Sequence, residues 1–430
     1  MTANSGLFYG YSIMTTDVDV QFFSHLNGLT LGNNWGDLIR LLDKCLVNGL
    51  PLTSITSASI DAQGDITLNL YAAHNCMLFQ IVELTGFTPS EINGKYRVKG
   101  TPSANQLILK ATHVGKTITT TGAAKLAPLG YDIIFRDAND VKRVYRAKNP
   151  IAQHPFIRID ETISDGVNSY NSAYVKYAMV GLIEHMEHID DYANPNKLQL
   201  PFDPSTPEKN WKITGTGTSV IRGWSKLFWA TSSYTALGNT PVNGDRKFTL
   251  CGDKDVFYIV IGTNIDDNAR RYLYGMGIYE SALPASVIPP WCLLTPINST
   301  AASQADNPVK GKYPLLYGNS ERKFAVLDYD ELTPYKAHIY CDPILPDNYT
   351  GMSSAAFTGT PIAALEIPIA DESKRLRGTL KHVCYAGSNL TATVNKTTPL
   401  QGESSMYVAE LSVSNGNNTG AVIFYLGEIE

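Results

Sequence analysis

The chain is 430 residues long, which favours two to four domains over a single one. Charged residues make up only 17% of it, against roughly 25% in a typical globular protein, while Tyr, Gly and Pro are abundant. This balance predicts a mainly β fold with an uncharged polar surface, and the formal net charge of −5 gives no sign of nucleic-acid binding.

The sequence shows no targeting or membrane-spanning segment. Its first residues lack a basic region followed by an apolar core, so no signal peptide is expected. No apolar run reaches the length of a spanning helix. The cysteines are scattered without a CxxC pair, so we expect buried thiols in a reducing compartment rather than a zinc site or a disulfide framework. They are Cys45, Cys76, Cys251, Cys292, Cys341 and Cys384.

Residues 1–27 are predicted to form an N-terminal arm. Their aromatic side chains follow no clear period, so either the rest of the chain or another subunit has to cover them. A helix is expected next, in GNNWGDLIRLLDKCLVNGLP, with Asn34 as its N-cap and Gly49 followed by Pro51 as its end. Its apolar residues form one stripe, which is typical of an amphipathic helix packed on a sheet. The stripe consists of Leu38, Leu41, Leu42, Cys45 and Leu46.

A small β-barrel or sandwich is predicted to follow the helix, within a domain over residues 28–126. Apolar and polar residues alternate there with the period of strands. Asn93-Gly94 is expected to form a tight hairpin turn with positive φ angles. The expected strands cover 66–71, 79–85, 95–98, 106–111 and 116–121.

A β-rich central domain is predicted over residues 127–297. It begins with a hairpin over 131–145, followed by a strand in HPFIRIDETI. The segment 174–192 suits a helical face, although a strand reaching about residue 181 fits as well. The further strands expected in this domain cover 212–214, 225–230, 247–251, 255–262 and 271–279.

The last predicted domain spans residues 298–430 and is also β. Its expected strands lie near 324–329, 338–341, 379–385, 406–413 and 421–426. The fold class is therefore mainly β and multi-domain, with small barrel or sandwich modules, one N-terminal amphipathic helix and few other helices.

Two groups of side chains suggest chemistry. His185 and His188 stand three residues apart among acidic neighbours and could share a metal on a helix, but no third ligand is marked, and a solvated polar face is the simpler interpretation. The acids of 160–161 and of 328–331 could be cast as a glycosidase pair, although acids in loops more often cap turns.

Three further patterns carry little chemical information. The glycine-rich segment 215–218 lacks the lysine of a phosphate loop, so a turn is expected. Cys384 and His382 would share one face of a strand, without a motif that supports a nucleophile. Aromatic residues between 211 and 279 could stack on sugars, though core packing is the stronger expectation. The candidates for such glycan binding are Trp211, Trp224, Trp229 and Tyr272.

The segment AAHNCMLFQIVELTGFTPSEINGKYRVKGTPSANQLILK resembles a module that recurs in tail, baseplate and fibre proteins of tailed bacteriophages. The shared pattern is a His-Asn or His-Gly turn, an apolar strand, Gly-x-x-Pro, then Leu/Ile-Asn-Gly-x-Tyr-x-Val and a closing strand. The turn of this module corresponds to Ile92, Asn93, Gly94, Tyr96 and Val98. Other matching positions are His74, Asn75, Val82, Gly86, Pro89, Leu107 and Leu109.

Other segments are similar to a group of uncharacterised phage structural proteins. LIRLLDKCLVNG looks like their start, and RKFTLCGDKDVFYIVIGT and RLRGTLKHVCY look like their later segments. Lys381 stands where that group tends to have proline. The resemblance implies no catalytic residues.

The resemblance implies a structural protein of the virion, made in the bacterial cytoplasm and built into a tail, baseplate or neck. Such a protein would act through contacts with other virion proteins, as a homo-oligomer in a symmetric ring or fibre, with no cofactor, metal or enzymatic activity. One alternative is a decoration protein or adhesin that binds a host surface glycan. A glycan depolymerase is the second alternative.

Overall fold

The computed structural model describes residues 16–216, 219–232, 238–265, 271–284, 288–297, 324–328, 337–344, 364–387, 397–415 and 418–430. They form mainly β-strands, which confirms the mainly β character of the predicted fold class. The described helical segments are α1 (Asp37–Leu42), the π-helical turn η2 (Asp43–Asn48) and three short 3-10 segments, η1 (His25–Asn27), η3 (Ser90–Ile92) and η4 (Pro207–Trp211).

The largest assembly of strands is a 13-stranded antiparallel sheet, called the long sheet below. It takes strands from both sides of the predicted boundary at 297/298. In spatial order it contains β1 (Gln21–Ser24), β17 (Phe248–Gly252), β18 (Val256–Ile261), β19 (Tyr272–Ile278), β21 (Trp291–Leu294), β22 (Phe324–Val326), β23 (Ile339–Pro343), β24 (Leu365–Asp371), β25 (Leu376–Gly387), β28 (Asn418–Glu428), β27 (Ser405–Asn415) and β26 (Thr398–Gly402). The short strand β20 (Glu280–Ser281) pairs with β25.

The remaining strands form three smaller sheets. The central sheet contains β13 (Gln199–Leu200), β12 (Lys176–Ile183), β11 (Phe156–Asp160), β10 (Lys142–Ala147) and β9 (Tyr131–Arg136), with β16 (Lys226–Ala230) on β12. A two-stranded sheet pairs β14 (Ile213–Thr214) with β15 (Ile221–Arg222). The seven-stranded sheet contains β2 (Leu50–Pro51), β8 (Ala123–Leu126), β5 (Ile81–Thr85), β6 (Gly94–Ser103), β7 (Gln106–Leu109), β4 (Ile66–Leu70) and β3 (Ile55–Ile60).

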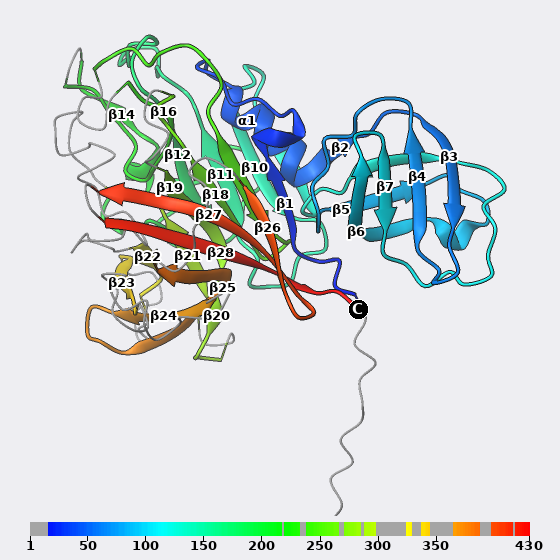
Figure 1. Ribbon diagram of the computed structural model, residues 1–430. Coiled ribbons are helices and arrows are strands. Elements are labelled where there is room, and N and C mark those ends of the chain that lie inside the picture. Colours follow the sequence, from blue (N-terminus) through cyan, green and yellow to red (C-terminus); the bar gives the residue numbers. More distant parts are fainter. Residues whose placement is uncertain are drawn as a thin grey trace, which may run out of the picture.

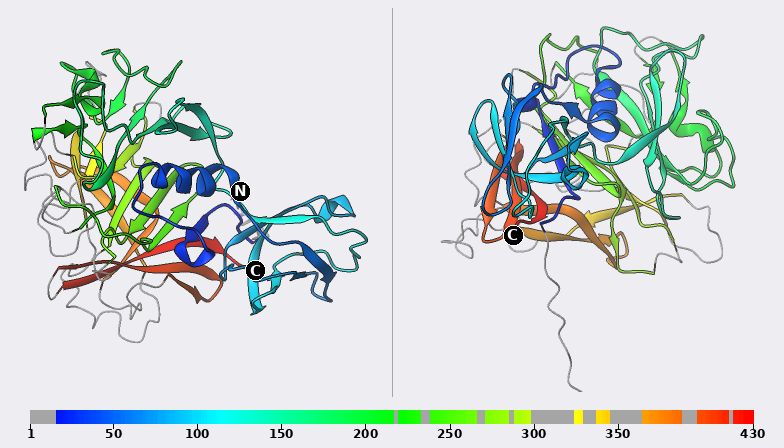
Figure 2. Two further views of the ribbon diagram at one scale, coloured as in Figure 1. Left: turned by 90° about the horizontal axis from the view of Figure 1, so that it is seen from above. Right: turned by 90° about the vertical axis from the view of Figure 1, so that its right-hand side faces the viewer.

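The seven-stranded sheet curls into a lobe that projects from one side of the body, while the long and central sheets form the body itself (Figures 1 and 2). One apolar core nevertheless runs from the lobe past α1 into both body sheets. A second core lies inside the curled long sheet, where the rings of Tyr258 on β18 and Phe424 on β28 meet with centroids 6.1 Å apart.

Strand β18 shows why the segment VFYIVI is apolar throughout. Its residues are all buried, because the strand has one core on each face. Alternate side chains enter the two cores: Phe257, Ile259 and Ile261 enter the first, and Val256, Tyr258 and Val260 enter the second.

A buried ion pair crosses the interior of the long sheet. Arg271 beside β19 and Glu410 on β27 are almost fully buried, and Nη1 of the arginine lies 2.6 Å from Oε2 of the glutamate. The other carboxylate oxygen accepts hydrogen bonds from the hydroxyls of Thr249 and Thr397. The hydroxyl of Ser24 on β1 lies 2.7 Å from that of Thr397, so the polar network reaches the edge of the sheet.

The guanidinium of Arg97 fastens the lobe to the body. This residue on β6 is fully buried and donates hydrogen bonds to the backbone carbonyls of Asp17 (2.6 Å), Phe79 (2.7 Å) and Leu426 (2.7 Å). Burial lowers the pKa of Arg97 to about 10, so the group stays charged at neutral pH. One side chain thus joins three parts of the chain that are distant in sequence.

The described end of the predicted arm packs on the protein's own body. Phe22 and Phe23 on β1 are fully buried, and Gln21 donates to the carbonyls of Ile81 (2.8 Å) and Ala127 (2.9 Å). The backbone N–H of Asp17 donates to the carbonyl of Glu428 (2.9 Å), so the two ends of the described chain are neighbours. The sequence left open whether the rest of the chain or another subunit covers the aromatic residues of the arm. For Phe22 and Phe23 the rest of the chain covers them.

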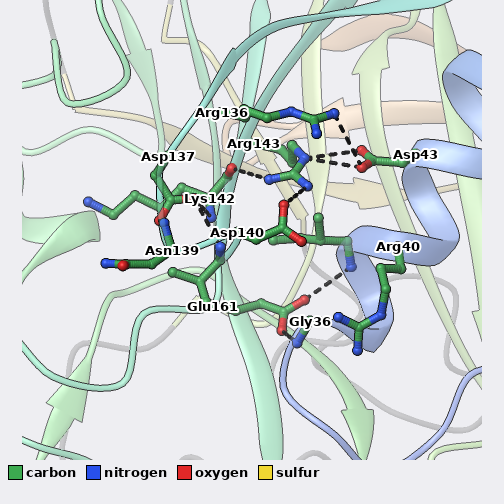
Figure 3. A network of polar contacts seen from close by, with 12 residues as sticks. Gly36, Arg40, Asp43, Arg136, Asp137, Asn139, Asp140, Lys142, Arg143 and Glu161 are labelled. Carbon is green, nitrogen blue, oxygen red and sulfur yellow. Dashed lines mark hydrogen bonds and ion pairs between the residues drawn. The ribbon is translucent and has the colours of Figure 1, made fainter.

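Helix α1 begins differently from the prediction. Its N-cap is Gly36, not Asn34, and the cap side chain is replaced by Glu161 from the end of β11. The Glu161 carboxylate accepts hydrogen bonds from the backbone N–H groups of Gly36 and Ile39 (Figure 3). A distant carboxylate therefore satisfies the free N–H groups of the first turn.

The junction between α1 and η2 is tied to the β9–β10 hairpin. Asp43 accepts hydrogen bonds from Arg143 Nε (3.2 Å) and from the Tyr145 hydroxyl (2.7 Å), and Arg143 also pairs with Asp140 (Figure 3). Because Arg143 and Tyr145 are buried, these contacts fix the helix on the central sheet.

Glu161 should make stability depend on pH around neutrality. Burial raises its pKa from 4.5 to about 7, although the two N–H groups favour the charged form. Between these values the folded protein holds a proton that the unfolded chain releases, so the free energy of unfolding should fall as pH rises, by about 3 kcal/mol in all. Urea unfolding at pH 5 and pH 7.5 measures the change, and Glu161→Gln should remove most of it. An unchanged pH dependence in the variant would contradict this assignment.

Both predicted hairpins of the body are confirmed. Strands β9 and β10 pair across the turn at 137–141, and β17 and β18 pair across 253–255. The segment 174–192 was expected to be either a helix or a strand, and the structure has a strand there, β12. Two other expectations are wrong or incomplete: residues 116–121 form only an isolated bridge at Thr120, and strand β3 was not expected.

The predicted Asn-Gly hairpin turn is also wrong. Asn93 has an extended backbone (φ −75°), and β5 and β6 are joined by a longer loop that contains η3. The Asn93 side chain instead holds this loop, since it accepts from the N–H of Phe87 (2.8 Å) and donates to the carbonyl of Ser90 (2.9 Å). The amide is used as a side-chain clamp, which a turn propensity does not distinguish. Of the other module residues, Ile92 and Val98 are core and Tyr96 donates to the Ile92 carbonyl.

Candidate functional site

A cleft of about 900 Å³ opens on the long sheet beside β25. We call it the β25 cleft; its walls come from β20, β24, β25, β27 and β28. This volume lies within the range of sites that bind small molecules.

Strand β25 changes its neighbour at this cleft. Its first part pairs with β20 up to Thr379, and its later part pairs with β28 from Val383 onward. On its other edge, the pairing with β24 also skips residues 380–383. Residues 380–382 therefore lie outside every described strand ladder, and the strand bulges there.

His382 lies in this bulge with a left-handed backbone (φ 59°), which is costly for a residue with a side chain. Its Nε2 lies 3.0 Å from Oδ2 of Asp253 in the β17–β18 turn. Beside it, Lys381 Nζ lies 2.6 Å from Oδ2 of Asp255, whose other oxygen lies 2.8 Å from Nε2 of His154. The bulge thus turns Lys381 and His382 toward two carboxylates.

These contacts keep the two aspartates ionised. The hydrogen bond from His154, supported by the Lys381 ammonium, holds the pKa of Asp255 below its usual value. Burial acts to raise the pKa of Asp253, but the His382 contact outweighs it and the pKa is lowered. The positive charge of Lys381 is therefore balanced from within the protein.

The outer part of the cleft is acidic and aromatic. Glu280 and Glu366 are exposed and pair with no cation among the described residues. The half-buried rings of Tyr407 and Tyr425 lie side by side, with centroids 5.5 Å apart and planes inclined by 50°. The Tyr425 hydroxyl donates to Glu428, which fixes that ring.

The predicted histidine pair forms no metal centre in the described part of the chain. His185 and His188 are exposed at the end of β12, and His185 lies 3.8 Å from Glu187. Among the described residues, no three His, Cys, Asp or Glu side chains are grouped so that they could hold a metal.

The aromatic residues proposed for glycan binding do not form an exposed platform. Trp211, Trp229 and Tyr272 are buried in the cores. Trp224 is half-buried between Lys209 and His338. The spacing of these residues could not show whether they are exposed or buried, because aromatic residues favour strands in either case.

The candidate carboxylate pair is also used elsewhere. Asp160 lies 2.8 Å from Arg158, whereas Glu161 caps α1. Of the other candidates, Asp328 is half-buried, and Asp330 and Glu331 lie outside the described residues. In the glycine-rich segment, Gly215 occupies the predicted turn between β14 and β15, while residues 217–218 are not among those described.

Cys384 is a poor nucleophile. Burial raises its pKa to about 12, so little thiolate exists at neutral pH. The residues of the cleft that sequence reasoning missed are Tyr407, Tyr425, Glu280 and Glu366. The adjacent Lys381 and His382 between the apolar residues Leu380 and Val383 were the one available signal.

Strand β3, at one edge of the lobe, is a second candidate surface. It pairs with β4 alone within residues 16–216, which are described without a gap. Its sequence, ITSASI, contains neither a charge nor a proline, and its side chains are exposed or half-buried. A bulge between Ile55 and Ser57 leaves the rest of the strand regular.

Other edge strands, namely β1, β2, β9 and β26, have features that discourage pairing with another chain. Strand β2 contains Pro51, β26 contains Pro399, and β9 carries Asp132 and Arg136. Edge strand β1 is fully buried. Strand β3 is thus the edge best suited to accept a further strand.

No protein-family model matches the chain, and no curated protein is significantly similar to it. No described helix is both long enough and apolar enough to cross a bilayer.

Proposed function

We propose that this chain is a structural component of a bacteriophage virion, built into a tail, baseplate or neck through protein–protein contacts. The observation that best supports an assembly role is the unprotected edge strand β3 on the projecting lobe. A protein that stays alone usually blocks such an edge, because unpaired backbone groups recruit other strands. The resemblance of residues 72–110 to phage modules supports the virion as the assembly to which this chain belongs.

The partner of β3 is a second copy of this chain. A strand without charges can pair with itself in antiparallel orientation around a two-fold axis, which gives a dimer, and such a dimer can be one unit of a larger symmetric assembly. We further propose that residues 28–126 act as a module that presents this edge. Residues 1–15 of the predicted N-terminal arm lie outside the described residues. The proposal assigns no catalytic role to the chain.

The β3 edge is tested by the oligomeric state of the purified chain. The wild type should form a homo-oligomer in native mass spectrometry, and Ser59→Lys should shift it toward the monomer, since a lysine on an edge opposes pairing. Thr101→Lys adds the same charge at another exposed position of the lobe and should leave the oligomer intact. A wild-type monomer, or equal effects of the two variants, would refute the β3 contact.

The virion assignment needs a separate measurement. Mass spectrometry of purified particles from a phage that encodes this chain should detect it in multiple copies per virion. Its absence from particles, with the protein present in the infected cell, would overturn the assignment.

A further inference from the structure

The β25 cleft has the composition of a ligand site rather than of a surface depression. It combines backbone groups outside any described ladder, a strained histidine and a pair of adjacent tyrosines. Strained non-glycine residues persist only where the surroundings hold them, and they are frequent at binding sites. Here the contact between His382 and Asp253 provides the support.

The charges of the cleft exclude anionic ligands. Its two cationic candidates, Lys381 and His382, are already paired with Asp255 and Asp253. The exposed carboxylates of Glu280 and Glu366 remain and make the entrance negative. A phosphate, a sulfate or an acidic sugar would therefore be repelled.

The remaining groups fit the two sides of a sugar ring. The Tyr407 and Tyr425 rings offer an apolar face on which the C–H groups of a sugar can pack. The Glu280 and Glu366 carboxylates can accept hydrogen bonds from the hydroxyls of the sugar, and the Thr379 hydroxyl can both donate and accept.

A cationic ligand fits less well. A polyamine would pair with the carboxylates, but it has no acceptor for the Thr379 hydroxyl. The hydroxyls of a sugar both donate and accept, so they can pair with this hydroxyl as well as with the carboxylates. We propose that the β25 cleft binds a neutral oligosaccharide.

The test is a titration of the full chain with neutral hexasaccharides of glucose, xylose, mannose and N-acetylglucosamine, monitored by saturation-transfer NMR and calorimetry. A galacturonic acid hexamer serves as the anionic probe, and spermine serves as the cationic probe. We expect at least one neutral sugar to bind, the galacturonate hexamer not to bind, and spermine to bind more weakly than the sugar. Absence of binding by every neutral sugar at millimolar concentration, or preference for either charged probe, would overturn the proposal.

Two variants place the binding in the cleft. Tyr407→Ala should weaken it about tenfold through loss of ring contact, and Glu366→Gln should weaken it while conserving the shape of the side chain. Tyr71→Ala removes an exposed tyrosine on the lobe and should leave binding unchanged. Equal binding by Tyr407→Ala and the wild type would show that the sugar binds elsewhere. This inference is independent of the β3 contact, whose test measures the oligomeric state.

Discussion

Replacing Arg97 with methionine should lower the free energy of unfolding by about 3–5 kcal/mol. The change removes three hydrogen bonds and leaves the carbonyls of Asp17, Phe79 and Leu426 buried without this donor. Methionine fills much of the space, so the loss is chiefly polar. Denaturation by guanidinium chloride, followed by tryptophan fluorescence, measures the effect.

Two further variants distinguish the effect of the three Arg97 hydrogen bonds from the effect of its positive charge. Arg97→Lys keeps the positive charge but cannot reach three carbonyls from one planar group, so most of the loss should remain. Arg136→Met removes an exposed arginine whose nearest carboxylate is 3.9 Å away, and it should change stability by less than about 1 kcal/mol. If Arg97→Met were as mild as Arg136→Met, the lobe would be held by its apolar contacts alone.

Replacing Glu410 with leucine should cost about 3–5 kcal/mol, because Arg271 is then buried without its counter-charge. Arg271→Met should cost a similar amount for the converse reason. The double variant should recover most of the loss, since a buried ion pair and a well-packed apolar pair often differ little in stability. Thermal and chemical unfolding of the four proteins give the coupling free energy directly. Additive losses would show that the two side chains act independently.

The strands that sequence predicted best are those with a core on one or both faces. The apolar run within 255–262 and the alternation at 131–145 could be recognised locally, because burial on one or both faces of a strand determines which of its residues are apolar. Strand β24 was missed because Pro368 interrupts its pattern, and in the structure a register shift accommodates this proline.

The candidate sites were harder to predict than the strands. The β25 cleft gathers Glu280, Glu366, His382 and Tyr407, which are separated in sequence and meet only through the order of strands in the long sheet. The bulge at His382 depends on a change of neighbour along β25, and no local pattern records that change. By contrast, the tryptophans were proposed for glycan binding only because they are aromatic. In the structure Trp211 and Trp229 are core residues, and large aromatic side chains are common in cores.

The contact between Asp17 and Glu428 constrains how the protein can fold while it is being synthesised. Strand β1 emerges from the ribosome long before β28, but the contacts of Asp17 with Glu428 and of Arg97 with Leu426 form only after residues 426–428 have been made. Contacts of such long sequence separation make folding slow and leave unfinished sheet edges exposed in the meantime. The growing chain should therefore depend on chaperones until residues 426–428 have been made.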